Sequence, residues 1–185
     1  ACAPYQETWT RPDLADASAS ASYIQLDTVA HRVILFGDGG ASDVDPSNPQ
    51  RLIDPTLVAL AARAAEIPAR TTVAVLGDTV YPKGVPPAGE KHAAERKRAN
   101  DALAAQLAAI TSSGARAVLV AGNHDWEYGL AGVGRQADMA RATPNGGNAN
   151  VQFVPTPGLP GPVTLDVGQR VRLIALDTEW WIRGD

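Results

Sequence analysis

The stretch that decides the fold is Val118-Leu119-Val120-Ala121, followed at once by Gly122-Asn123-His124-Asp125. Four small or branched apolar residues in a row are typical of a buried strand in a parallel sheet. In open α/β sheets, ligands bind just beyond the carboxyl ends of such strands. We therefore expect Asn123, His124 and Asp125 to lie where chemistry takes place.

Two earlier stretches repeat this arrangement of an apolar run followed by glycine and polar residues. Val33-Ile34-Leu35-Phe36 precedes Gly37-Asp38-Gly39-Gly40, and Val73-Ala74-Val75-Leu76 precedes Gly77-Asp78-Thr79-Val80-Tyr81. Strands are thus predicted over residues 32–36, 71–76 and 116–121. Neighbouring parallel strands would bring their polar ends to one edge of the sheet.

Helices are predicted between these strands. Asp54-Pro55 is typical of a helix start, because a capping carboxylate precedes a proline in the first helical position. The longest helix is predicted over residues 90–111, and Gly114 is placed to end it. The alternation of strand and helix predicts an α/β fold with a parallel sheet and right-handed crossovers.

The last third of the chain has a different pattern. A shorter helix is predicted over residues 135–142 and a loop over residues 144–150. Short strands are predicted over residues 151–154, 163–167 and 170–177, and Gly168-Gln169 forms the turn between the last two.

Length and composition are those of one globular domain. The chain has 185 residues, of which 45% are hydrophobic and 19% charged, and its net charge is −4. The sequence contains no basic block, so we expect no nucleic-acid partner. No apolar run approaches the roughly 18 residues of a membrane span. Residues 1–30 read as an extension or tether, and residues 31–185 hold the domain.

The single cysteine, Cys2, excludes an internal disulfide. Ala1-Cys2, followed by a polar segment rich in Ala and Ser, resembles the start of a mature bacterial lipoprotein. This interpretation predicts a lipid anchor at Cys2 and a location in the cell envelope or outside the cell. An ordinary surface cysteine is the alternative.

The three strand ends together offer two carboxylates, a phenol and an amide, from Asp38, Asp78, Tyr81 and Asn123. Oxygen ligands of this kind form sites for hard cations. Two carboxylates held close without a cation would repel each other. A phosphate-binding P-loop fits poorly, because no Gly-Lys-Ser/Thr follows any strand.

The motifs Gly37-Asp38-Gly39-Gly40, Gly77-Asp78-Thr79-Val80-Tyr81 and Gly122-Asn123-His124-Asp125 resemble the first three motifs of the calcineurin-like metallophosphoesterases. Gly40, where many members carry a ligand histidine, and Tyr81 resemble the small tartrate-resistant type of purple acid phosphatase. The resemblance covers roughly residues 32–180. It implies a layered α/β/β/α sandwich, of which this chain supplies roughly the N-terminal half.

The resemblance also implies a dinuclear centre that hydrolyses phosphate monoesters of small molecules or proteins. Asp38 and Tyr81 would bind the first metal, Asp78 would bridge both, and Asn123 would bind the second; the pair would be Fe with Fe, Zn or Mn. A metal-bound hydroxide would be the nucleophile. His124 would be the catalytic residue that faces the phosphate and its leaving group.

One departure from the family pattern stands out. The family supplies further histidines from a Val-x-x-His-like motif and a Gly-His-x-His motif, whereas this chain has only His31, His92 and His124. We expect His31 and His92 to be surface residues. We therefore expect the missing ligands on a continuation beyond Asp185 or on a second polypeptide, without which the metal sphere is incomplete.

Several roles stay open at the level of sequence. Asp125 either orients His124 or caps the next turn, Trp126 either lines the substrate pocket or packs in the core, and Trp180-Trp181 either covers the core or shapes the substrate mouth. A phosphodiesterase or nucleotidase with the same site is one alternative function. A non-catalytic phosphate-binding or interaction module is the other.

Overall fold

The computed structural model of the protein describes residues 26–143 and 150–183. Four parallel strands form one sheet in the order β1 (Arg32–Phe36), β2 (Thr71–Val75), β3 (Arg116–Leu119) and β4 (Val151–Phe153). The register pairs Phe36 with Val75, Val75 with Leu119 and Leu119 with Phe153, so the carboxyl ends of all four strands lie level at one edge.

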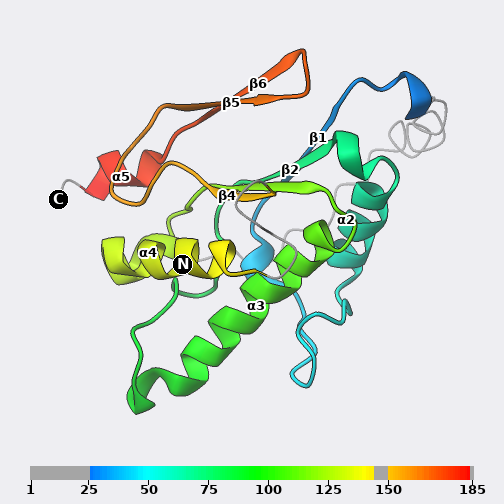
Figure 1. The fold of residues 1–185 in the computed structure, drawn as a ribbon. Coiled ribbons are helices and arrows are strands. Elements are labelled where there is room, and N and C mark those ends of the chain that lie inside the picture. Colours follow the sequence, from blue (N-terminus) through cyan, green and yellow to red (C-terminus); the bar gives the residue numbers. More distant parts are fainter. Residues whose placement is uncertain (1–25, 144–149, 184–185) are drawn as a thin grey trace, which may run out of the picture.

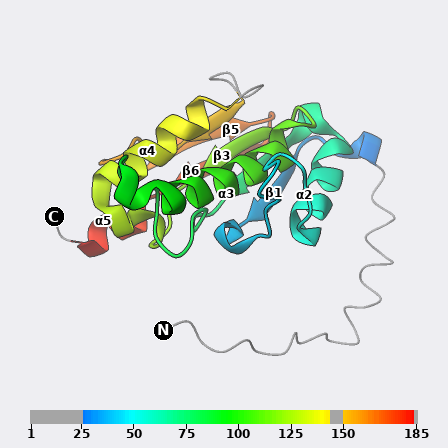
Figure 2. The same ribbon diagram turned by 90° about the horizontal axis from the view of Figure 1, so that it is seen from below.

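Three helices cover one face of this sheet: α2 (Pro55–Ala65), α3 (Ala93–Thr111) and α4 (Gly129–Arg141). A hairpin of two antiparallel strands, β5 (Val163–Val167) and β6 (Val171–Ala175), lies beyond the opposite face, and the short helix α5 (Thr178–Arg183) follows it. The four-stranded sheet therefore lies between a helical layer and the hairpin (Figures 1 and 2). Short 3₁₀ turns complete the connections: Leu26–Thr28, Gly39–Ala41, Pro68–Arg70, Glu90–His92 and Asp125–Tyr128.

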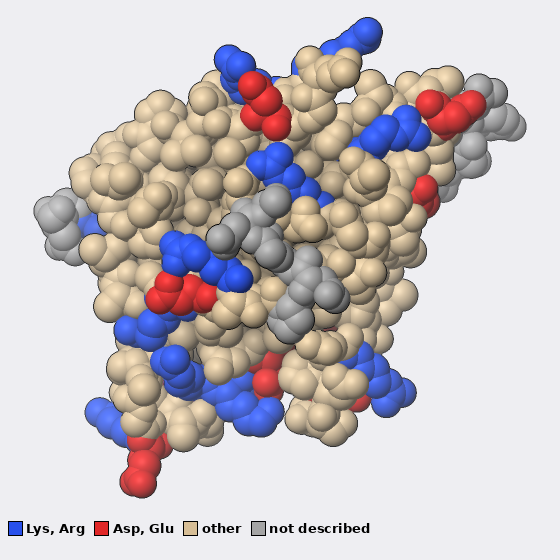
Figure 3. All heavy atoms as spheres, viewed as in Figure 1, with Lys and Arg blue, Asp and Glu red and all other residues tan. Residues whose placement is uncertain are grey.

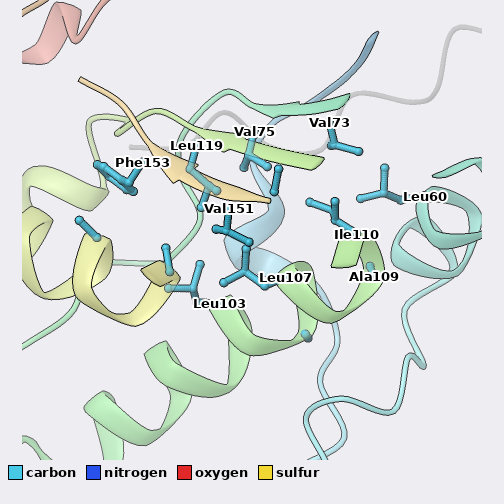
Figure 4. Close-up of a cluster of buried hydrophobic side chains, with 14 of the residues drawn as sticks. Leu60, Val73, Val75, Leu103, Leu107, Ala109, Ile110, Leu119, Val151 and Phe153 are labelled. Carbon is cyan, nitrogen blue, oxygen red and sulfur yellow. The ribbon is translucent and has the colours of Figure 1, made fainter. Parts of the chain in front are cut away.

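The core lies between the sheet and the helices. Leu103, Leu107 and Ile110 of α3 are at most 1% exposed and face the strands (Figure 4). Strand residues that point toward the helices, such as Val73, Val75 and Leu119, are equally buried. Burial of such side chains contributes about 1.5–3 kcal/mol each, and this burial fixes the strands whose ends carry the polar motifs.

The opposite face of the sheet is covered only in part. Ala74 and Val118 are buried there, whereas Leu35 is 67% exposed and Leu76 is 54% exposed. Ile182 of α5 is 75% exposed. An apolar area thus remains open on the side of β1 and β2 away from the helices.

The α/β class and the parallel sheet predicted from the sequence are confirmed. The Asp54 carboxylate caps α2 by accepting from the N–H groups of Thr56 and Leu57. Helix α3 ends at Thr111 as predicted, but its C-cap is Ser112, so Gly114, with φ +84, lies in the turn beyond the helix and does not end it. Gly168, with φ +65, lies in the β5–β6 turn.

Some predicted boundaries were wrong. Helix α4 begins at Gly129 rather than at residue 135, because Val133, Ala137 and Ala140 pack into the core and outweigh the helix-weakening glycines before them. The predicted first turn of the long helix, Glu90–His92, is a 3₁₀ turn. Strands β2, β3, β4 and β6 are one to three residues shorter than predicted. Trp180-Trp181 lies in α5, a helix that was not predicted.

Cys2 with nearly all of the predicted tether, most of the predicted loop at residues 144–150, and Asp185 lie outside the described residues. Within the described part, no helix is long and apolar enough to cross a membrane. On the face shown in Figure 3, basic and acidic groups lie side by side. Ion pairs between neighbouring residues include Arg172–Asp166 and Arg141–Asp138.

Candidate metal and phosphate site

The polar ends of β1, β2 and β3 meet at the carboxyl edge of the sheet, as the sequence predicts. Backbone hydrogen bonds join the first two loops: the Asp38 N–H donates to the Gly77 carbonyl over 3.2 Å, and the Gly40 N–H donates to the Asp78 carbonyl over 2.9 Å. This pairing continues the strand register past the end of the sheet and sets the two carboxylates side by side.

Tyr81 joins these two carboxylates. Its hydroxyl oxygen lies 2.7 Å from Asp38 Oδ1 and 3.0 Å from Asp78 Oδ2. Burial and the two neighbouring carboxylates raise the pKa of the Tyr81 phenol well above its ordinary value, so the phenol keeps its proton in the absence of a cation. Oxygen atoms of three side chains, which come from two loops, therefore converge on one point.

The backbone at both carboxylates lies in the left-handed region, with φ 58 at Asp38 and φ 52 at Asp78. Among the described residues these are the two non-glycine positions with positive φ. Such conformations are uncommon outside glycine, although Asp tolerates them better than most residues, and they cluster at functional sites. The strain coincides with the residues that the motifs single out.

Two glycines allow the loops to approach closely. A Cβ atom at Gly40 would lie 2.7 Å from Tyr81 N and 2.9 Å from the Asp78 carbonyl oxygen, both backbone atoms. A Cβ atom at Gly122 would collide with the Asp78 carboxylate. Position 40 therefore has no room for a side chain.

Asn123 is exposed and lines a pocket of about 430 Å³ beside the two carboxylates. The pocket includes Glu179 of α5, which the sequence did not single out because no glycine-containing motif follows the strand before it. The residues that line the pocket are Asp38, Leu76, Gly77, Asp78, Ala121, Gly122, Asn123, Thr178, Glu179 and Ile182.

His124 is held at the rim by three contacts. Its backbone N–H donates to Asp78 Oδ1 over 3.0 Å, and its ring Nδ1 lies 2.7 Å from the Pro82 carbonyl oxygen. Its ring also meets the Tyr81 ring edge-on, with centroids 4.5 Å apart. A carbonyl oxygen only accepts, so Nδ1 carries the proton and Nε2 is the nitrogen available to a ligand.

Asp125 takes neither of the roles that the sequence left open. It is fully buried, and its carboxylate accepts from the N–H groups of Gly122 and Val80 over 2.9 and 3.2 Å and from the Thr79 hydroxyl over 3.1 Å. Burial raises the pKa of the Asp125 carboxyl, and these hydrogen bonds oppose that change. Asp125 thus joins the second loop to the third, while His124 is oriented by Pro82.

Trp126 belongs to the core and not to the pocket lining. It is 5% exposed, and its indole Nε1 donates to both carboxylate oxygens of Asp177, at 2.9 and 3.2 Å. Asp177 is itself buried and also accepts from the Trp180 N–H. Of the two adjacent tryptophans, Trp180 packs against the core and Trp181 is 52% exposed.

The other histidines lie away from the carboxylates, and both are partly buried, which corrects their prediction as surface residues. His31 precedes β1, and its Nε2 lies 3.0 Å from Thr72 Oγ1. His92 faces Tyr128 and Glu95. In residues 26–143 and 150–183, no group of three or more His, Cys, Asp or Glu side chains is arranged to hold one metal ion.

The donor set present fits one hard cation and part of a second site. Asp38, Asp78 and Tyr81 supply three converging oxygens, which suits a hard cation. A second cation would find Asp78 and Asn123 among the described residues, fewer than the ligands such an ion takes.

Comparisons with protein-family models, with curated proteins and with solved structures gave no match.

Proposed function

We propose that this chain supplies one half of a dinuclear metal centre that hydrolyses phosphate monoesters, within a layered α/β/β/α metallophosphoesterase sandwich. The observation that carries the proposal is the convergence of Tyr81 with Asp38 and Asp78, at 2.7 and 3.0 Å, on the carboxyl edge of a parallel sheet. The two left-handed aspartates and the glycines that admit them support it.

In this proposal Asp38 and Tyr81 hold the first cation, Asp78 holds both, and Asn123 holds the second. The pair is iron with iron, zinc or manganese. When bound, two cations neutralise phosphoryl oxygens and lower the pKa of water to near neutrality. The chain's own contribution is to hold these oxygens in place before the substrate arrives.

His124 is the proposed proton donor to the leaving group. Because Nδ1 donates to Pro82, the ring is fixed with Nε2 available, and the contact with Tyr81 limits its rotation. The ring is partly exposed, so a substrate can reach it. A protonated Nε2 would also stabilise negative charge on the phosphoryl oxygens.

The remaining ligands would come from a continuation of the polypeptide or from a second chain. The open apolar area formed by Leu35, Leu76 and Ile182 supports this part of the proposal, since it adjoins the pocket and would be covered by further structure.

The deciding experiment measures metal content and hydrolysis together, on the full-length protein with any partner polypeptide bound. We expect two metal ions per molecule and faster hydrolysis of p-nitrophenyl phosphate than of bis(p-nitrophenyl) phosphate. We also expect a visible absorption band from the Tyr81 phenolate bound to iron, which Tyr81→Phe should lack. Diester preference would replace the proposal by a phosphodiesterase or nucleotidase.

A non-catalytic phosphate-binding module is the second candidate, and it is favoured by the finding that no three His, Cys, Asp or Glu side chains are grouped around one point in the described part of the chain. Fewer than two metal ions per molecule, with phosphate binding retained, would establish this candidate in place of the enzyme.

A further inference from the structure

Four polar side chains are buried together behind the candidate site, on the side of the helices. Thr79, Asp125 and Gln136 are 0% exposed, and Gln106 is 1% exposed. They come from the second loop, the third loop, α4 and α3, so each belongs to a different element of the fold. Burying polar groups costs free energy unless they are paired, and this cluster therefore calls for a reason.

Thr79 is the centre of this cluster. Its hydroxyl donates to Asp125 Oδ1 over 3.1 Å and accepts a short hydrogen bond from Gln136 Nε2. Its carbonyl accepts from Gln106 Nε2 over 2.8 Å. Helices α3 and α4 thus both hold the residue that directly follows Asp78.

Asp125 connects Thr79 of the second loop to the backbone of the third loop. Its carboxylate accepts from the Gly122 N–H over 2.9 Å, and Gly122 directly precedes Asn123. The chain of contacts therefore runs from α4 through Gln136, Thr79 and Asp125 to the two loops that present Asp78 and Asn123.

Stability alone does not explain the composition of this cluster. The side-chain oxygens of Gln106 and Gln136 are buried and have no hydrogen-bond partner among the described residues. Each such group lowers the stability of the fold, and an apolar residue of similar shape would avoid that cost. Polar residues kept at such a cost are typical of sites where geometry matters.

We propose that Thr79, Asp125 and Gln136 are positioning residues that fix the spacing between Asp78 and Asn123, so that α4 sets the geometry of the site. The proposal rests on the proposed function, because the spacing between Asp78 and Asn123 matters for metal binding only if both residues are metal ligands. The mechanical connection between the two loops can be measured without any metal.

The test uses Thr79→Val, which keeps the shape of the side chain and removes the hydroxyl. We expect amide hydrogen exchange in residues 120–127 of the metal-free protein to speed up about tenfold, although the substitution lies in the other loop. We expect the affinity for Mn²⁺, measured by calorimetry, to fall about tenfold. Gln136→Leu is the milder variant and should change both quantities in the same direction.

Thr111→Val is the matched control. Thr111 is a buried threonine of α3 whose hydroxyl donates to the Leu107 carbonyl over 2.8 Å, away from the site. It should leave exchange in residues 120–127 and Mn²⁺ affinity unchanged. The double variant Thr79→Val/Gln136→Leu should be no worse than Thr79→Val, because both partners of one hydrogen bond are then absent.

Unchanged exchange in residues 120–127 in both Thr79→Val and Gln136→Leu would overturn the positioning role. If the wild-type protein binds no Mn²⁺ but exchange responds as expected, the connection stands and the proposed function fails. If Mn²⁺ binds and neither variant alters its affinity, the proposed function is untouched and the positioning role fails.

Discussion

His124 and Pro82 are joined by a hydrogen bond of 2.7 Å between the imidazole Nδ1 and the backbone carbonyl oxygen. The loop that carries Pro82 is itself anchored, since Arg135 donates to the Val85 carbonyl and Arg96 to the Pro86 carbonyl. The orientation of one ring at the candidate site therefore depends on a loop that two guanidinium groups hold in place.

Replacing His124 by alanine should impair turnover but not metal binding. Loss of a general acid lowers kcat by about 10²–10⁴-fold, and the metal content should stay the same because the proposed ligands are other residues. Turnover of p-nitrophenyl phosphate and metal analysis measure the two effects. His92→Ala, beside Glu95 and Tyr128, is the control and should keep full kcat. A loss of metal in His124→Ala would make the residue a ligand instead.

Asp78→Asn should abolish the proposed metal centre. The amide keeps the shape of the side chain but removes the charge that both proposed cations would need, so affinity for Mn²⁺ should fall by more than the roughly 10–100-fold typical of a supporting residue. Calorimetric titration with Mn²⁺ measures this affinity. Asp101→Asn, in an exposed pair with Lys97 on α3, is the control. Equal affinities in the two variants would contradict the assignment.

Gly40→Ala should destabilise the protein by about 1–3 kcal/mol, because the new Cβ atom would meet backbone atoms that lack freedom to move. Gly134→Ala, in α4 with open space around the new atom, should instead stabilise it by up to about 1 kcal/mol. Urea unfolding of both variants gives the comparison. A Gly40→Ala protein as stable as the wild type would show that the two loops are less closely packed than described.

Stability should decline as pH falls through the ordinary pKa of His31. Burial and the neighbouring Arg116 lower the pKa of this imidazole in the folded state, so the unfolded chain binds the proton more readily. The free energy of unfolding then falls from about pH 6.5 downward, toward the lowered pKa of the folded state. Urea titrations between pH 7.5 and 5 should show a smaller decline in His31→Gln. An identical decline in both proteins would assign it to other groups.

The strands and their polar ends could be predicted because both are local. An apolar run followed by glycine and aspartate indicates a strand, the turn after it and the position of the polar residues at the carboxyl edge of the sheet. Asp38, Asp78 and Tyr81 converge as expected. The cap at Asp54 was predictable for the same reason. Helix α4 was placed too late because glycines weaken helices locally, whereas the packing of Val133 and Ala137 is a tertiary effect.

The supporting residues could not be predicted. Gln106 and Gln136 look like ordinary polar positions of surface helices, and only the three-dimensional structure shows that both are buried against Thr79. Asp125 was singled out by its motif, but two of its partners, Thr79 and Val80, lie in a loop some 45 residues earlier in the chain. Backbone groups such as the Pro82 carbonyl leave no trace in the sequence at all.

The left-handed aspartates have a consequence for the stability of the protein without bound cations. Asparagine tolerates this backbone conformation as well as aspartate does, and it would remove the repulsion between positions 38 and 78. Asparagine at both positions should therefore raise the free energy of unfolding of the cation-free protein, although the packing of the leucines of α3 stays the same.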